Sequence, residues 1–235
     1  MKIIVPAYSK TYWALKPFTH LFNKYWKMEN ATILHYAPIP FSLPNNFELK
    51  SIYYKDYPRD KWANGVIEYL ETIDDEVVVL LLEDYWLARE VNTSTMRIIE
   101  TFLESNPNIL RVDLTTDRLY AGGCRDVGYL NWLDLVEAPQ SQYQMSLQAG
   151  MWRRDNLLNV LTSLNDNARS SWDVEIQGTS IINEHYDKFR VLGTRQNPLR
   201  YVNGINDSSG INTNLNMMSD TDKKYVKKWI EENAK

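Results

Sequence analysis

The stretch VVVLLLEDYW, from Val77 to Trp86, constrains the fold more than any other part of the chain. Its six apolar residues, Val77–Leu82, are too few to span a bilayer, which takes about 20. An apolar run of this length is typical of a strand that is buried on both faces, as in a parallel sheet. Glu83 and Asp84 follow directly, so we expect the buried strand to end at two carboxylates.

Strand-like and helix-like segments alternate through the first half of the chain. The expected strands are Ile3–Val5, which we expect Pro6 to stop, Thr32–Tyr36, Phe47–Tyr54, Val77–Leu82 and Ile109–Leu114, and the expected helices are Thr11–Tyr25, Asp60–Ile73 and Thr93–Leu103. Parallel strands need crossover connections, which are usually helices. The order therefore predicts an α/β fold, Rossmann-like, with a mostly parallel central sheet and helices on both faces.

The second half is less regular. Strands are expected at Tyr143–Leu147, Phe189–Leu192 and Leu199–Val202, helices at Arg154–Leu164, Ser171–Asn183 and Ser219–Asn233, turns at Gly122, Gly123 and Gly128, and a loop at Gly204–Asn216. The sequence contains no internal repeat and no clear interdomain linker, so we expect residues 1–235 to form a single domain.

Composition narrows the class of protein. The net charge of −4 argues against general nucleic-acid binding, although it leaves room for a local basic groove. The single Cys124 cannot form an intrachain disulfide, and no Cys/His metal cluster is present, which fits a reducing, cytoplasmic setting. The N-terminal MKIIVPAY has no apolar segment long enough for a signal peptide.

Glu83 and Asp84 are expected at the rim of the sheet, because ligands of open parallel sheets bind at the carboxyl ends of the strands. Successive side chains of a strand point to opposite faces, so one of the two should face a ligand. The alternative is a pair of solvated or helix-capping acids.

Several short segments together resemble a known family. IIVPAYSK, PFTHLFNKYW, LLLEDYWL, SLQAGMWRRDNLL, SSWDVE and YVNGI occur in this order over about 200 residues. The chain thereby resembles GT-A-fold glycosyltransferase-like proteins of bacteria and phages, of the surface-polysaccharide or phage DNA-modifying type. The resemblance implies a nucleotide-sugar-binding half at 1–115 and an acceptor-side half with a C-terminal helix at 116–235.

The resemblance implies a donor site around the first strands. Ala7, Tyr8, Ser9 and Asn64 would contact the nucleotide, and Glu83 and Asp84 would bind ribose or a divalent cation, Mn²⁺ or Mg²⁺, which prefer oxygen ligands. Asp84 and His185 are the candidate metal ligands. Tyr85 stands where the family motif often has a second acid, and a lone His185 is also consistent with an ordinary surface residue.

The segment SLQAGMWRRDNLL provides further candidates for the donor. Gly150 would let the backbone approach a ligand closely, and Gln148 and Trp152 would contact the sugar. Arg153 or Arg154 would pair with the diphosphate, because a guanidinium matches phosphate geometry. The alternative is that Trp152 belongs to the core and both arginines are solvated.

The segment SSWDVE provides the candidate for the catalytic base. Ser170 and Asp173 have the spacing of a capping box, which alone accounts for Asp173. Glu175 projects about 200° around the helix from Asp173. In inverting GT-A enzymes a carboxylate at such a place deprotonates the acceptor hydroxyl, so Glu175 is the preferred catalytic base and Asp173 the second choice. The alternative is an ordinary solvent-facing acid.

The sequence does not choose the acceptor of the expected UDP-sugar hexosyltransferase. It is either a glycan or a hydroxymethylpyrimidine in phage DNA, which would need a basic, aromatic groove. Candidates for such a groove are Arg89, Arg97, Arg153, Arg154, Arg169 and the cluster Lys223–Lys228, and Asp113, Asp117 and Arg118 are further candidates for acceptor or nucleotide contacts. Two other functions stay open: a non-catalytic nucleotide-sugar or glycan-binding module, and a nucleotidyltransferase, which the lack of a Gly-rich loop in IIVPAYSK disfavours.

Overall fold

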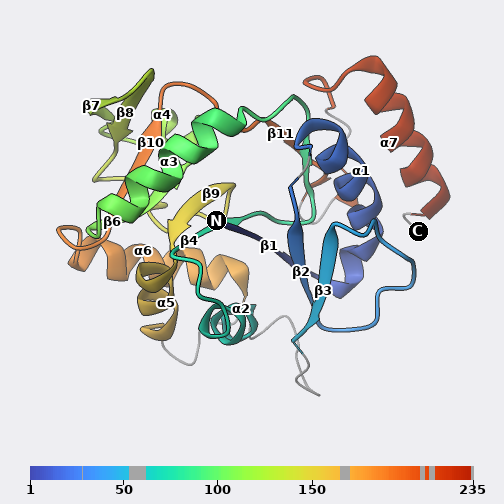
Figure 1. Ribbon diagram of the computed structural model, residues 1–235, viewed down its shortest axis with the longest axis horizontal. Helices are drawn as coiled ribbons and strands as arrows, with labels where there is room; N and C mark the ends of the chain where they lie inside the picture. The colour runs from blue at the N-terminus through green and yellow to red at the C-terminus, as the bar shows by residue number, and fades with distance from the viewer. Residues whose placement is uncertain (28, 53–61, 165–169, 207–209, 212–214, 234–235) are drawn as a thin grey trace.

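Strand β4 (Val77–Leu80) lies inside a nine-stranded sheet of the order β3-β2-β1-β4-β9-β6-β10-β8-β7. The computed structural model describes the whole chain except residues 28, 53–61, 165–169, 207–209, 212–214 and 234–235 (Figure 1). The other strands of the sheet are β1 (Lys2–Ala7), β2 (Ala31–His35), β3 (Phe47–Ser51), β6 (Ile109–Asp113), β7 (Arg125–Leu130), β8 (Leu133–Glu137), β9 (Gly150–Arg153) and β10 (Arg190–Thr194). Strands β9 and β8 run against the other seven, so the mostly parallel α/β sheet predicted from the sequence is confirmed.

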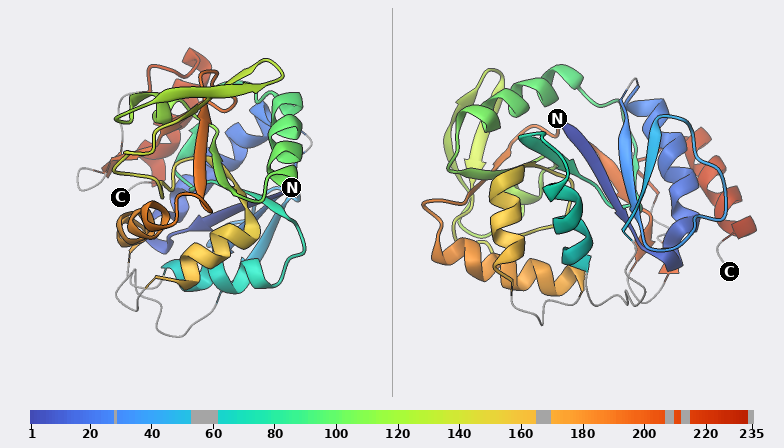
Figure 2. Two further views of the ribbon diagram at one scale, coloured as in Figure 1. Left: turned by 90° about the vertical axis from the view of Figure 1, so that its left-hand side faces the viewer. Right: turned by 60° about the horizontal axis from the view of Figure 1, so that its bottom comes forward.

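Helices cover both faces of the sheet (Figure 2). They are α1 (Leu15–Tyr25), α2 (Trp62–Glu71), α3 (Thr93–Ser105), α4 (Asp117–Tyr120), α5 (Arg154–Thr162), α6 (Ser171–Glu184) and α7 (Asp220–Asn233). Side chains alternate between faces along each strand, so Ile3 packs with α1 and α3 in one buried cluster, while Ile4 packs with α2, α5 and α6 in another. Within the described residues, no helix is both long and apolar enough to cross a membrane.

The first half follows the sequence prediction apart from the short strand β5 (Tyr85–Leu87), which was not predicted, and two further differences. Strand β1 continues through Pro6 to Ala7, although the proline was expected to stop it. The carbonyl of Ile4 accepts the Leu81 N–H, and the pairing of β1 with β4 ends there. The backbone nitrogen of Pro6, which has no hydrogen to donate, therefore faces a side of β1 where no strand is paired. The first helix begins as a 3-10 helix, η1 (Ser9–Ala14), before α1. The expected start of the second helix at Asp60 lies outside the described residues.

In the second half, the predicted strand Tyr143–Leu147 is wrong, because this segment is irregular. Strand β9 and the hairpin of β7 and β8 were not predicted from the sequence. The hairpin turns at Asn131 and Trp132, and Asn131 has a φ of 54°, a left-handed conformation that asparagine tolerates. Gly128, the expected turn, lies inside β7 at a register shift.

Two short two-stranded sheets complete the fold. Strand β5 (Tyr85–Leu87) pairs with β11 (Tyr201–Asn203), and β12 (Ile205–Asn206) pairs with β13 (Gly210–Ile211). Helix α7 lies along α1 at the edge of the molecule (Figure 1), where the Trp229 indole N–H donates to the Trp13 carbonyl at 2.9 Å.

Candidate functional site

A cavity of about 210 Å³ opens where β1, β2 and β4 end. We call it the strand-end cavity. Its lining residues are Pro6, Tyr8, Ser9, Thr11, Tyr36, Trp62, Leu82, Glu83, Asp84, Ser171 and Ile205. Four of the residues expected at the donor, Tyr8, Ser9, Glu83 and Asp84, therefore lie together at the carboxyl ends of parallel strands, where such folds bind ligands.

Glu83 connects the end of β4 to the loop after β1. Its Oε1 accepts the Tyr8 N–H at 3.2 Å and the Thr11 hydroxyl. The side chain is 6% exposed, and burial raises the pKa of the Glu83 carboxyl although both hydrogen bonds oppose the rise. Glu83 thus orders the loop that carries Tyr8 and Ser9.

Asp84 is half-buried in the same cavity and begins a sharp change of chain direction. Its carbonyl accepts the Gly204 N–H at 2.7 Å, which joins the strand end to the segment after β11. Tyr85 and Tyr201 stack with ring centroids 4.3 Å apart, and Trp86 is fully buried. The two aromatic residues that follow the carboxylates therefore join this part of the site to the segment 201–204.

A second cavity, of about 630 Å³, lies on the other side of the first turn of α6. We call it the α6 cavity. Ser171 lines the strand-end cavity, whereas Trp172 and Glu175 line the α6 cavity, so the two are neighbours. Further lining residues are Asp117, Arg118, Tyr120, Ala121, Gly122, Gln140, Ser141, Gln142, Tyr143, Ser146 and Gln148.

Glu175 is held in a defined position on the wall of the α6 cavity. Its Oε1 accepts the Leu147 N–H at 2.6 Å, and the Leu147 carbonyl in turn accepts the Tyr85 hydroxyl at 3.4 Å. Burial raises the pKa of Glu175, while the Leu147 N–H and the charge of Arg111 oppose the rise. The raised pKa makes the Glu175 carboxylate a stronger base than an ordinary glutamate, which suits a group that accepts a proton.

Arg111 of β6 orders the irregular segment that carries these contacts. Its guanidinium, 1% exposed, donates to the Ser146 carbonyl and to the Gln148 carbonyl at 2.8 Å. It lies over the Trp152 ring at 4.6 Å. The fully buried Trp152 is therefore a core residue, the alternative left open by the sequence.

The Arg111 side chain fills the space that Gly150 leaves open. A β-carbon at position 150 would lie 2.4 Å from Arg111 Nε. The glycine was expected to let a ligand approach the backbone, but here it makes room for a side chain of the protein itself.

A buried ion-pair network lies beneath the α6 cavity. Asp113, at the end of β6, contacts Nε of both Arg111 and Arg118 at 2.9 Å. Arg118 also donates to Gln144 Oε1 at 3.0 Å. Partial burial and the nearby Asp113 raise the pKa of Asp117, which lies at the mouth of the cavity. Asp113, Asp117 and Arg118, the further candidates from the sequence, therefore lie together at the α6 cavity.

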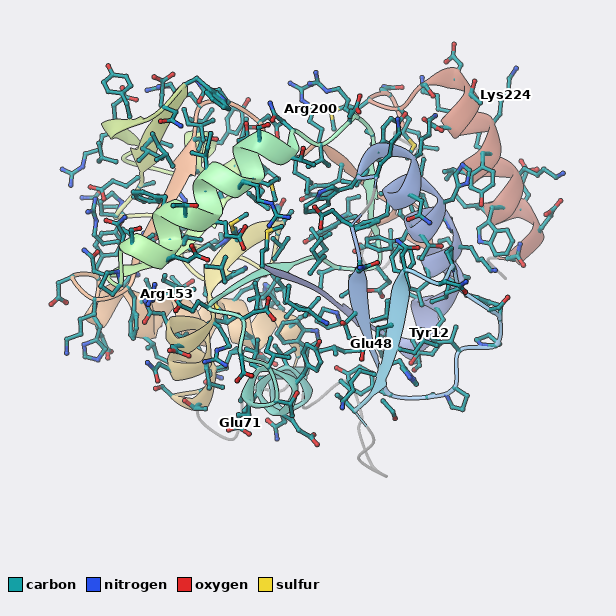
Figure 3. The ribbon with its side chains drawn as sticks, in the orientation of Figure 1. Tyr12, Glu48, Glu71, Arg153, Arg200 and Lys224 are labelled. Atoms are coloured by element: carbon teal, nitrogen blue, oxygen red, sulfur yellow. The ribbon has the colours of Figure 1, made fainter. Side chains whose placement is uncertain are left out.

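Other expected donor contacts lie elsewhere. Arg153 pairs with Val77 at the start of β4, the opposite end from Asp84, and donates to the Leu103 carbonyl at 2.8 Å, at the end of α3 (Figure 3). Arg154 donates to the Ile73 carbonyl. Both guanidinium groups bind backbone carbonyls away from the strand-end cavity, so we assign neither to a diphosphate.

The expected metal ligands are not brought together. His185 follows the 14-residue helix α6, about 21 Å along the axis from Ser171 in the strand-end cavity. It is exposed and lies edge-on to Phe189. Among the described residues, no three His, Cys, Asp or Glu side chains are grouped to hold a metal ion. The described part of the chain therefore does not form a metal centre of its own.

The remaining candidates line neither cavity. Ser170 and Asp173 form the predicted capping box at the start of α6, with the Ser170 N–H donating to Asp173 at 2.8 Å. Ala7 is fully buried in β1, and Asn64 is exposed on α2 without lining the strand-end cavity.

The arginines and lysines proposed for a DNA groove are dispersed. Arg97 on α3 pairs with Glu100 at 2.9 Å, and the cluster Lys223–Lys228 lies on α7 at the edge of the molecule (Figure 1). Arg169 lies outside the described residues. Of the described members of the set, none lines either cavity.

Several residues of the two cavities were not predicted from the sequence. Tyr36 and Trp62 line the strand-end cavity, and Tyr143 and Trp172 line the α6 cavity. Tyr36 directly follows β2, and the ends of neighbouring parallel strands meet at one edge, so its place could have been predicted. Trp172 stands beside the capping serine, which gives its place on the helix but no sign of a cavity.

Comparisons with known proteins show the fold and no family. No protein-family model matches the chain, and no curated protein matches it. Residues 1–349 of TarS from S. aureus align with a TM-score of 0.50 and 13% identity, over 82% of this chain and 58% of that one. At that identity the likeness shows the fold alone, and it agrees with the fold class predicted from the sequence.

Two further solved structures align over 99% of this chain. UDP-glucose pyrophosphorylase gives a TM-score of 0.49 at 8% identity, covering 99% of its chain. A cytidylyltransferase from Leptospira borgpetersenii gives 0.47 at 11% identity, covering 94% of its chain. These scores are too low to support an argument about this chain.

Proposed function

We propose that the protein is a glycosyltransferase that moves a hexose from a nucleoside-diphosphate sugar, preferably a UDP-sugar, to a hydroxyl acceptor with inversion. The observation that carries this proposal is the position of Glu175. Its carboxylate is fixed by the Leu147 N–H on the wall of a large cavity, next to a smaller cavity at the strand ends.

In this proposal the nucleotide occupies the strand-end cavity. Tyr36 and Trp62 offer ring faces to the base, and Tyr8 and Ser9 offer polar groups on an ordered loop. Asp84 would bind the ribose hydroxyls, or would hold a cation that the donor diphosphate carried with it. The sugar then extends past Ser171 toward Gln148 and Glu175.

The reaction is a single displacement. Glu175 removes the proton of the acceptor hydroxyl while that oxygen forms a bond to the anomeric carbon. The bond between the anomeric carbon and the diphosphate oxygen breaks, and the nucleoside diphosphate leaves with the bonding electron pair. One base suffices, and inversion follows because no enzyme nucleophile intervenes.

Donor binding is tested by thermal unfolding with UDP-, GDP- and TDP-sugars, each with and without Mn²⁺. A donor at 100 times its Kd stabilises the folded state by about 2.7 kcal/mol, which raises Tm by about 5–11 °C for a chain of this size. Asp84→Asn should abolish the shift, and the exposed Asp126→Asn serves as the matched control. If no donor shifts Tm, the proposal is wrong.

Catalysis is tested with Glu175→Gln. The glutamine can still accept the Leu147 N–H, so folding and donor binding should persist while turnover falls by about 10²–10⁴. A non-catalytic binding module would show donor binding and no turnover in the unmodified protein. A nucleotidyltransferase would instead release pyrophosphate from a nucleoside triphosphate and a sugar phosphate, which a pyrophosphate assay detects.

A further inference from the structure

The α6 cavity has the side chains of a saccharide site. Three large aromatic side chains on its lining are strongly exposed: Tyr120 at 85%, Tyr143 at 47% and Trp172 at 60%. Exposed apolar side chains gathered at one place mark a binding surface. The electron-rich face of an aromatic ring packs against the C–H face of a sugar ring, whose hydrogens carry partial positive charge.

Neutral hydrogen-bonding groups line the same cavity. Gln140, Gln142 and Gln148 contribute amides, and Ser141 and Ser146 contribute hydroxyls. The Tyr201 hydroxyl donates to Gln148 Oε1, so Gln148 presents its NH₂ group as a donor. Sugar hydroxyls, which both donate and accept, match such a lining.

The charges on this lining disfavour a polyanion. Its acidic members are Asp117 and Glu175. The cationic lining residue, Arg118, is 2% exposed and already pairs with Asp113 and Gln144. Nucleic-acid sites bind phosphates through accessible Lys and Arg side chains, and the described lining offers none.

We propose that the α6 cavity is the acceptor subsite and that it takes a neutral saccharide, with one hydroxyl against Glu175 and sugar rings on Trp172 and Tyr143. That the saccharide is an acceptor rests on the proposed transferase function. Its binding in the cavity does not, so it can be measured without a donor.

The test is binding to an array of neutral oligosaccharides by the full chain, followed by calorimetry on the saccharides that bind. A DNA duplex containing hydroxymethylcytosine is measured in parallel at two salt concentrations. Variants Trp172→Ala and Tyr143→Ala remove cavity rings, and Tyr129→Ala is the matched control, because Tyr129 is 81% exposed on β7 outside the cavity lining. Circular dichroism verifies that each variant is folded.

We expect at least one saccharide to bind the parent protein. Both cavity variants should bind it at least tenfold more weakly, and Tyr129→Ala should bind it with the affinity of the parent. The proposal is overturned if no neutral saccharide binds, if neither cavity variant weakens binding, or if the DNA binds in a salt-sensitive manner that Trp172→Ala abolishes. Saccharide binding without any donor response would uphold the cavity assignment and refute the transferase. Donor turnover without saccharide binding would support the transferase and refute the assignment of the α6 cavity as a saccharide site.

Discussion

Replacing Gly150 by alanine tests whether Arg111 explains the glycine. The added β-carbon would lie 2.4 Å from Nε and 3.0 Å from both Cζ and Nη2 of the Arg111 guanidinium. That guanidinium is buried against Trp152 and has little room to retreat. The substitution should therefore displace it from its partners.

The cost follows from those partners. Arg111 donates to the carbonyls of Ser146 and Gln148 and pairs with Asp113 at 2.9 Å. Hydrogen bonds to charged groups contribute about 1.5–3 kcal/mol each, and breaking a buried ion pair costs about 3–5 kcal/mol. Because these contributions overlap, we expect Gly150→Ala to lower the free energy of unfolding by about 3–5 kcal/mol and Tm by about 6–20 °C.

Urea unfolding followed by tryptophan fluorescence measures the change. Gly122→Ala is the matched control, since a β-carbon there meets nothing within 4 Å. A Gly150→Ala protein within about 1 kcal/mol of the parent, at an unchanged dependence on urea, would refute the reasoning. If the variant instead kept its stability and lost donor binding, the glycine would serve ligand approach, as the sequence suggested.

Three further predictions concern single residues. Glu83→Gln keeps the acceptor for Tyr8 and Thr11 but cannot ionise. Because the pKa of Glu83 is raised in the folded state, its contribution to stability is complete below about pH 4.5 and is lost as pH rises through the raised pKa. The variant should therefore gain stability relative to the parent from pH 4 to pH 8 in urea titrations, and a constant difference would contradict this. Asn131→Val should cost about 1–2 kcal/mol at a φ of 54°, whereas Asn131→Gly should stay within a few tenths, as thermal unfolding of the pair will show. If Glu175 is the base, kcat should rise with pH through its raised pKa, and a flat acid limb would argue against that role.

Sequence patterns were sufficient for the first half of the fold. Strands β1, β2 and β4 are mostly apolar and buried, so their apolar character alone locates them in the sequence. The second half depends on tertiary contacts. The segment 143–147 alternates like a strand, but long-range hydrogen bonds hold it in an irregular conformation: Arg111 donates to the Ser146 carbonyl and Arg118 donates to the Gln144 side chain.

The candidate site divides in the same way. Asp84 follows an apolar strand and Glu175 follows a capping box, and both are local signals that a single sequence contains. Arg111 looks like an exposed residue in the middle of a strand, and only the fold shows its contact with Gly150 across the sheet. Arg153 was expected at the donor because its type suits phosphate, but its register with Val77 carries it to the other end of β4.

The place of β9 in the sheet has a consequence for how the chain folds. Residues 150–153 lie between β4 and β6, two strands that precede them by dozens of residues. As the chain leaves the ribosome, β4 and β6 are therefore made long before the strand that joins them. Unpaired apolar strand edges invite aggregation, and pairings distant in sequence form slowly. In a fragment that ends before residue 150, the edges of β4 and β6 that pair with β9 would stay unpaired. Expression of such a fragment should therefore yield a protein prone to self-association.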